Sequence, residues 1–231
     1  EGKDSFIYQQ VEQNFTDLLD RARIERDASI SMLYTGDTLG RLLAQQREDV
    51  SFGGLARRAA TINTIRERET HVLVLDAGDT FAAGDGNLSI NKVMIQAMNA
   101  MDYDAMGLGQ KDFEVGEQDL KELLSLANFP IICSNLRLDE NMTPWIASHA
   151  VVNSADRRIA ILSIIPPDFE NPIHGSNFIA PREALDIQFE SLKDQVDDFV
   201  LLTQYDALEI AKIIDAEDPV SVVFCDAQGG A

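Results

Sequence analysis

The stretch YDAMGLGQKDFEVG, Tyr103 to Gly116, decides the fold, because an apolar run is followed directly by a polar cluster. The run DAMGLG predicts a strand, and GQKD lies where that strand ends. Other apolar runs are followed by polar clusters in the same way: TGD at Thr35–Asp37, AGD at Ala77–Asp79, TQ at Thr203–Gln204 and CDAQ at Cys225–Gln228. The carboxyl ends of strands in an α/β sheet gather at one edge, so these clusters together predict a site. For a single cluster, the alternative is that Asp and Gly simply end the strand.

Helical and strand patterns alternate along the chain from Ile30 onward. Strands are expected at ISMLYT, HVLVLDAG, DAMGLG, PIICSN, DDFVLLTQ and VSVVFC, and helices at GGLARRAATINTIRERE, SINKVMIQAMNAM, GEQDLKELLSLAN, EALDIQFESLKDQ and ALEIAKIID. This alternation predicts an α/β fold with an at least partly parallel sheet. The runs WIASHAVVN and RRIAILSII, separated by SAD, predict a hairpin, so antiparallel pairing is expected as well.

Composition limits the classes of partner. The 231 residues are 45% hydrophobic, which is enough for one substantial core. The 39 acidic and 19 basic residues give a net charge of −20, which disfavours nucleic acid and anionic membrane surfaces. No apolar run approaches the ~18 residues that a membrane span needs. The two cysteines, Cys133 and Cys225, form neither a disulfide framework nor a CxxC metal motif.

The first residues differ from the rest of the chain. From Phe6 to Arg26, apolar residues recur at helical spacing, which predicts an amphipathic helix. We therefore expect a helical extension over 1–28 and an α/β domain over 29–231. The apolar stripe of the helix must be buried, and we expect a protein partner or a second copy to cover it. The chain starts at Glu1 without a leader, so we expect a mature, exported protein.

In their order and in the sequence between them, the polar clusters resemble the metallophosphatase (calcineurin-like phosphoesterase) superfamily. The resemblance is closest to the catalytic domain of 5′-nucleotidases and related exported enzymes, which include thiosulfohydrolases, and it runs from about Ile30 to Gly229. It implies a four-layer sandwich of two mixed sheets flanked by helices, a two-metal site at the strand ends, and a periplasmic or extracellular location. The family domain usually continues past its closing motif, so we expect 29–231 to lack the usual C-terminal part.

The resemblance places several residues at the family's motif positions. Asp37 matches the D-x-H motif, but Leu39 stands where the histidine belongs. Asp79 matches the metal-bridging carboxylate. In GQKDF, Gln110 replaces the asparagine ligand, Lys111 replaces the histidine that assists the leaving group, and Asp112 stands at the acidic position.

The later motifs have also lost their histidines. Gln204 stands where a histidine ligand is expected. In VVFCDAQGG, the closing positions are Asp226 and Gln228 or, with a one-residue change of register, Ala227 and Gly229. The remnant metal site therefore consists of Asp37, Asp79, Gln110, Gln204 and Asp226, with no imidazole, and a zinc or iron pair should not assemble on it.

These substitutions leave three hypotheses. The first is a catalytically degenerate, 5′-nucleotidase-like protein without a cofactor that serves as a structural or interaction module. The second is a metal-dependent phosphoesterase in which carboxylates and amides hold Ca²⁺ or Mg²⁺. The third is thiol chemistry at Cys225, against the reading of Cys225 as a core residue. Under the first, we expect the Lys111 amine to lie within salt-bridge distance of Asp37 or Asp79, in place of the missing cation.

Overall fold

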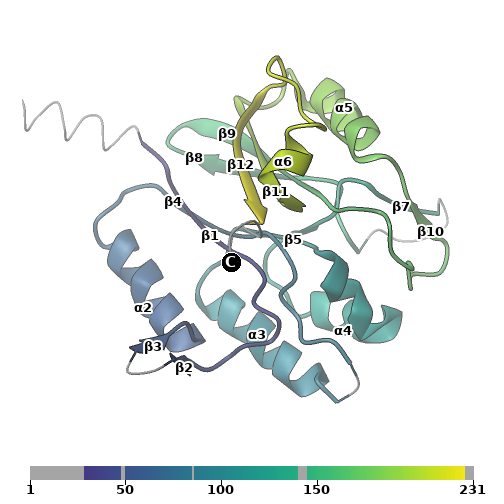
Figure 1. The fold of residues 1–231 in the computed structure, drawn as a ribbon. Helices are drawn as coiled ribbons and strands as arrows, with labels where there is room; N and C mark the ends of the chain where they lie inside the picture. The colour runs from purple at the N-terminus through teal and green to yellow at the C-terminus, as the bar shows by residue number, and fades with distance from the viewer. Residues whose placement is uncertain (1–28, 48–49, 85, 140–144, 227–231) are drawn as a thin grey trace, which may run out of the picture.

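The computed structural model describes residues 29–47, 50–84, 86–139 and 145–226. The expected N-terminal helix lies outside these residues. Within them, two four-stranded sheets pack face to face, and helices cover their outer sides (Figure 1). None of the helices in this part of the chain has the length and apolar character to cross a bilayer.

The first sheet has the strand order β1-β4-β5-β6. Its strands are β1 (Ser31–Thr35), β4 (Val72–Asp76), β5 (Ala105–Gly107) and β6 (Ile131–Ile132), and its helices are α2 (Leu55–Arg66), α3 (Leu88–Ala100) and α4 (Glu117–Leu124). Each strand is joined to the next by a helical crossover, and every neighbouring pair among these strands is parallel. The expectation of mixed pairing is therefore wrong for the described part of this sheet.

The second sheet has the order β12-β11-β9-β8 and is mixed, as expected. Its strands are β8 (Ala150–Ser154), β9 (Arg157–Ile164), β11 (Asp198–Asp206) and β12 (Val220–Asp226). The antiparallel β8 and β9 form the predicted hairpin, and positive φ angles of 49° at Ala155 and 59° at Asp156 make its tight turn. Helices α5 (Pro181–Leu192) and α6 (Ala207–Ile210) lie beside this sheet (Figure 1).

Three apolar layers show why the sheets stack in this way. Alternate residues of β4 point to opposite faces, so Leu73 and Leu75 enter the core between the sheets while Val74 faces the helices. Val200 and Leu202 of β11 meet them from the second sheet. An outer core lies between each sheet and its helices. The four-layer sandwich predicted from the sequence is confirmed.

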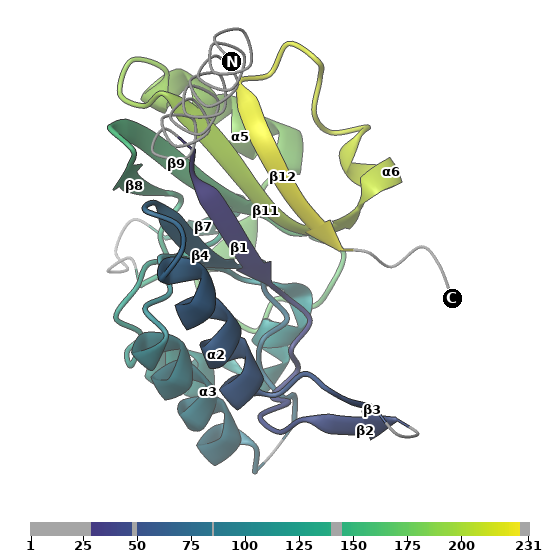
Figure 2. The ribbon, with the colours of Figure 1, turned by 90° about the vertical axis from the view of Figure 1, so that its left-hand side faces the viewer.

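Several short elements were not predicted. Two antiparallel ribbons pair β2 (Gln45–Arg47) with β3 (Val50–Phe52), and β7 (Leu136–Leu138) with β10 (Ser176–Phe178). The β2–β3 ribbon extends away from the sandwich (Figure 2). A 3-10 helix, Gln110–Val115, follows β5.

Helix α6 is shorter than the pattern ALEIAKIID predicts. The Asp206 side chain caps its start by accepting hydrogen bonds from the N–H groups of Leu208 and Glu209. The helix ends at Ile210, and beyond it the carbonyl of Ile213 accepts a hydrogen bond from the Arg182 side chain.

Candidate functional site

Two loops run side by side where β1 and β4 end, and they carry Asp37 and Asp79. The N–H of Asp37 donates to the carbonyl of Gly78 at 2.9 Å, and the N–H of Leu39 donates to the carbonyl of Asp79 at 2.9 Å. Both aspartates have a left-handed backbone, with φ of 50° and 53°. Aspartate is one of the few residues besides glycine that tolerates this conformation. The loops thus bring together the two carboxylates that the resemblance assigned to one site.

Lys111 lies between these carboxylates. Its Nζ is 3.4 Å from Oδ1 of Asp37 and 3.8 Å from Oδ2 of Asp79. Its backbone N–H also donates to Oδ1 of Asp79 at 2.9 Å. The predicted ion pair is confirmed. The side chains of Lys111 and Asp37 are 41% and 37% exposed, and only Asp79, at 9%, is buried, so the pocket is more open than the sequence suggested.

Asp112 does not face this ion pair, because backbone N–H groups occupy its carboxylate. Oδ2 accepts from the N–H groups of Asp79 and Gly109, and Oδ1 accepts from those of Thr80 and Phe81, at 2.7 to 2.9 Å. Burial raises the pKa of Asp112 to about 7, and the hydrogen bonds from Gly109 and Phe81 oppose that rise. Above this pH the ionised carboxylate holds the Asp79 loop in place. The acidic motif position is therefore a structural anchor.

The glycines of these loops permit the close approach. A Cβ atom on Gly109 would lie 2.1 Å from Oδ1 of Asp79. Gly78 has φ of 101°, and a Cβ there would lie 2.4 Å from the nitrogen of Gly109. Any side chain at either position would displace Asp79 from Lys111.

The side-chain NH₂ groups of Gln204 and Gln110 both donate hydrogen bonds to other groups of the protein. Gln204 donates to the carbonyl of Ala77 at 2.7 Å. Gln110 donates to the carbonyl of Pro166 at 3.0 Å and to Oδ1 of Asp168 at 3.2 Å, in the segment after β9. Gln204 thus stays beside the Asp37 loop, whereas the amide of Gln110 is directed to the segment after β9.

The structure places Cys225 close to the carboxylates. The half-buried Cys225 lines a pocket of about 160 Å³ with Asp37 and Gln204, at the ends of β12, β1 and β11. Asp226 ends β12, and its backbone lies opposite Asp206 of β11, while its side chain lies outside the described part of the structure.

A buried carboxylate next to the site was missed in the sequence. Asp76, the last residue of β4, accepts hydrogen bonds from the hydroxyls of Thr35 and Thr80 and from the N–H of Gly78, at 2.5 to 2.9 Å. Burial raises the pKa of Asp76, and these hydrogen bonds oppose the rise. The sequence feature that could have revealed it is the position of Asp76 directly after the apolar residues of VLVLD, at the end of a predicted strand. Its bonds hold the ends of β1 and β4 together beneath the two loops.

The same network continues away from the site. The hydroxyl of Thr35 lies 2.9 Å from that of Tyr103, which accepts a hydrogen bond from Arg58 at 3.3 Å. Burial raises the pKa of Tyr103. Arg58 also donates to the hydroxyl of Thr38 at 3.0 Å, so one partly buried chain of polar groups connects β1, α2 and the Asp37 loop.

In the described part of the chain, the side chains that meet at the site include no imidazole. Among the described residues, no group of three or more His, Cys, Asp or Glu side chains is arranged to hold a metal ion. The histidines contact other parts of the chain: His71 accepts from the N–H of Ala155, His149 pairs with Gln188, and His174 pairs with Glu117. Two carboxylates and an ammonium form the centre of the site.

Comparisons with known proteins give a consistent result. No family model matches the chain. A snake venom 5′-nucleotidase from Crotalus adamanteus is 32% identical over 148 residues, which cover 58% of this chain and 25% of the venom protein. The 5′-nucleotidase of Bos taurus is 30% identical over 209 residues, covering 82% of this chain and 36% of the bovine protein. The chain thus spans well under half the length of these relatives.

Solved structures agree with the sequence relatives. A 5′-nucleotidase precursor from Thermus thermophilus superposes with a TM-score of 0.76 and 27% identity, over 85% of this chain and 41% of that one. The NAD nucleotidase of Haemophilus influenzae shares the fold, with a TM-score of 0.76 at 20% identity, over 86% of this chain and 38% of that one.

The role of Asp112 predicts a large effect of Asp112→Asn on stability. An amide oxygen can replace only one carboxylate oxygen, so two buried N–H groups lose their acceptor and face an NH₂ group instead. Because each unsatisfied group costs about 1–3 kcal/mol, the free energy of unfolding at pH 8 should fall by about 3 kcal/mol or more. Urea unfolding measures this free energy. Glu114→Gln, at an exposed position of the same 3-10 helix, serves as the control. Equal stabilities would contradict the anchoring role.

The exposure of Lys111 predicts a small effect of Lys111→Met. Partly exposed ion pairs contribute little, so the free energy of unfolding should fall by about 1 kcal/mol or less, and the difference should shrink as salt is added. The larger loss expected for a fully buried pair does not apply to this geometry. Lys212→Met removes an exposed lysine after α6 and serves as the control. A loss that salt leaves unchanged would show that charge is not the cause.

Proposed function

Since the chain belongs to the metallophosphatase (calcineurin-like phosphoesterase) superfamily and carries its 5′-nucleotidase-like domain, we propose that it is a catalytically degenerate member that acts as a structural or interaction module. One observation carries the proposal. The ammonium of Lys111 lies within 4 Å of both Asp37 and Asp79, where the family resemblance puts a metal cation.

The remaining motif positions support this proposal. A hydrolase of this family needs metal ions to generate a nucleophile and to neutralise the phosphoryl oxygens. Imidazole suits zinc, iron and related metals, and neutral amides replace it poorly. Gln204 and Gln110 use their amide groups as donors to carbonyls, and Asp112 is occupied by four N–H groups.

Lysine suits the position as a substitute cation. Its ammonium is a compact charge on a long, flexible stem, so it can reach two carboxylates from the 3-10 helix after β5. Without a positive charge, Asp37 and Asp79 would repel each other in a partly desolvated pocket. The lysine removes that repulsion and at the same time repels an incoming metal ion.

A rebuilt oxygen-ligand site is the second candidate. The half-exposed Asp37 and Gln204 line one pocket, and carboxylate and amide oxygens are the ligands that Ca²⁺ or Mg²⁺ prefers. In that case the protein would be a metal-dependent phosphoesterase. Thiol chemistry at Cys225 is the third candidate and the least supported, because a reactive thiol needs an electropositive setting and the acidic Asp37 lines the same pocket.

The domain boundaries and location belong to the same proposal. We place an N-terminal extension at 1–28 and the 5′-nucleotidase-like domain at 29–231, with the extension as a contact for a protein partner or a second copy. The similarity to a venom 5′-nucleotidase supports export to a periplasmic or extracellular compartment.

The proposal predicts no metal-dependent hydrolysis. With Mn²⁺, Zn²⁺ or Mg²⁺ supplied, the purified protein should release phosphate from AMP and from p-nitrophenyl phosphate no faster than its Asp79→Asn variant. Metal-dependent turnover that Asp79→Asn abolishes would establish the rebuilt oxygen-ligand site instead.

The substitute cation also predicts a gain of metal binding. In Lys111→Asn the two carboxylates lose their counter-ion, so affinity for Mn²⁺ should rise by about tenfold or more, equivalent to about 1.4 kcal/mol. Isothermal titration calorimetry measures the affinity. Lys212→Asn changes the net charge equally at an exposed position that does not line the pocket of Asp37 and should bind Mn²⁺ as the wild type does. An unchanged affinity in Lys111→Asn would show that Lys111 does not occupy the cation position.

A further inference from the structure

A pocket of about 210 Å³ lies beside the Asp37 loop, where that loop meets the start of α2 and the base of the β2–β3 ribbon. Asp37 lines this pocket, whereas Asp79, Lys111 and Gln204 do not. The pocket is therefore separate from the ion pair and shares one wall with it.

The loop that follows Asp37 turns back on itself and so positions Arg41. The N–H of Arg41 donates to the carbonyl of Thr38 at 3.0 Å, which closes a tight turn. The guanidinium of Arg41 donates to the carbonyl of Asp37 at 3.4 Å, and the side chain is exposed. This turn places a positive charge at the pocket.

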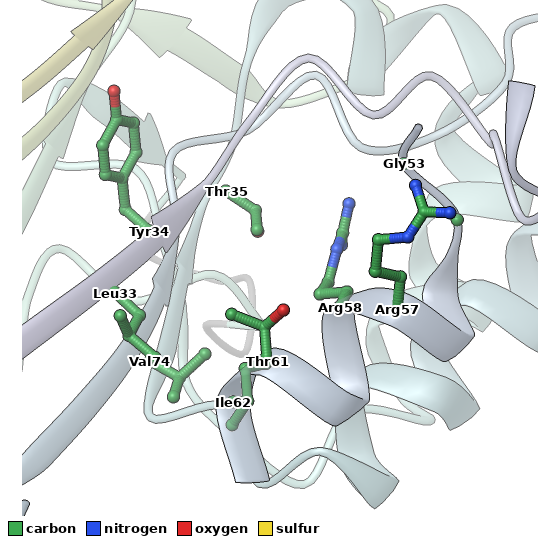
Figure 3. A pocket seen from close by; sticks show the side chains of 10 residues that line it. Leu33, Tyr34, Thr35, Gly53, Arg57, Arg58, Thr61, Ile62 and Val74 are labelled. Carbon is green, nitrogen blue, oxygen red and sulfur yellow. The ribbon is translucent and has the colours of Figure 1, made fainter. Parts of the chain in front are cut away.

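Arg58, the fourth residue of α2, supplies a second positive charge. The half-buried side chain donates to the hydroxyls of Tyr103 at 3.3 Å and Thr38 at 3.0 Å, which fix its position. Figure 3 shows it extending from α2 into the space between Thr35 and Gly53. The pocket drawn there, of about 310 Å³ between β1 and α2, shares Arg58 with the smaller pocket. The charge of Arg58 is therefore held at the boundary of both.

Neither guanidinium is paired with an acid. In the part of the chain that the structure describes, Arg157 and Arg182 form ion pairs with aspartates, whereas Arg41 and Arg58 have no carboxylate within 4 Å. The charge of Arg58 acts on the buried Asp76 only over a longer distance. A guanidinium has five N–H donors, so donors remain for a ligand. In a chain with a net charge of −20, two such arginines at one pocket indicate a site for an anion.

Two further groups at the pocket favour an anion. Thr38 is only 5% exposed, and its hydroxyl accepts a hydrogen bond from Arg58. Among the described residues, that hydroxyl donates its own proton to no acceptor, so the proton is available to a ligand. The N-cap of α2 is Gly54, which has no side-chain cap, and the first turn of the helix contains no acidic residue. The positive end of the helix dipole is therefore not offset by a neighbouring carboxylate of that turn.

The rim of the pocket is apolar. The side chains of Leu43 and Phe52 are 82% and 42% exposed. Phe52 pairs with Gln45 at the opposite end of the ribbon from Arg47 and Val50, so it lies at the base of the ribbon. A cavity of about 150 Å³ holds a benzene molecule, so this pocket has room for one ring or a short aliphatic chain beside an anionic group. Covering the two exposed side chains would add to the affinity.

We propose that this pocket binds a small organic acid in which one carboxylate is joined to one apolar group. The carboxylate lies between Arg41 and Arg58 and accepts the proton of Thr38, and the apolar group covers Leu43 and Phe52. The two arginines and Asp37 give the lining a net charge of +1, which matches a singly charged carboxylate better than a doubly charged anion. The inference goes beyond the proposed function and stands if the protein is an enzyme.

An NMR titration of the full, ¹⁵N-labelled chain with phenylacetate tests the proposal. The amide signals of Thr38, Gly53 and Gly54 should shift and saturate. The affinity should be at least about tenfold higher than for acetate, which lacks the ring, and for sulfate, which lacks the ring and carries two charges. Phenethylamine has the same ring with a positive charge and should leave these signals in place.

Two substitutions at exposed positions separate the parts of the site. Arg41→Gln should weaken phenylacetate binding by about tenfold. Arg68→Gln removes the same charge at an exposed position after the other end of α2, outside the pocket, and should bind as the wild type does. Leu43→Ser should reduce the preference for phenylacetate over acetate.

The amide spectrum of each variant shows whether it is folded. No saturable shift, equal shifts with phenethylamine, or unchanged affinity in Arg41→Gln would overturn the proposal. Sulfate that binds as tightly as phenylacetate would overturn it as well, because the pocket would then hold an adventitious ion only.

Discussion

The carboxylate of Asp112 determines the geometry of the whole site, because it gathers four backbone N–H groups from two separate loops. Those bonds hold Asp79 in a left-handed backbone conformation and bring Gly109 against its side chain. Asp37 then follows, since its loop is hydrogen-bonded to the loop of Asp79. The frame therefore persists for a structural reason, whether or not the residues that it presents can catalyse a reaction.

Lys111 gives that frame a different chemistry. In a metal site, two carboxylates are brought together because the cation offsets their repulsion. Here a side chain of the same segment supplies the positive charge, so the arrangement needs no ion from solution. The partial exposure of the lysine and of Asp37 means that the pair adds little to stability. Under the proposed function its consequence is instead selective, because an ammonium beside Asp37 and Asp79 repels a metal cation at this position.

The apolar runs of the sequence predicted the order of strands and helices, whereas the four layers and the ion pair of Lys111 were predicted from the resemblance to the metallophosphatases. Apolar runs gave the strands, and the clusters after them placed Asp37, Asp79 and Lys111 at one edge. The use of Asp112 could not be predicted, since a sequence does not show whether an acid faces a pocket or backbone N–H groups. Asp76 was missed for a related reason: its partners, Thr35 and Thr80, come from strand β1 and from the loop after β4.

The central claim is that an ammonium, and not a metal, lies between Asp37 and Asp79. Anomalous diffraction from crystals grown with MnCl₂ tests it most directly, because manganese and the lysine nitrogen are distinguished at the same position. We predict electron density for the Lys111 side chain between the two carboxylates, with no anomalous peak there. An anomalous peak between Asp37 and Asp79, with Lys111 turned into solvent, would contradict the account.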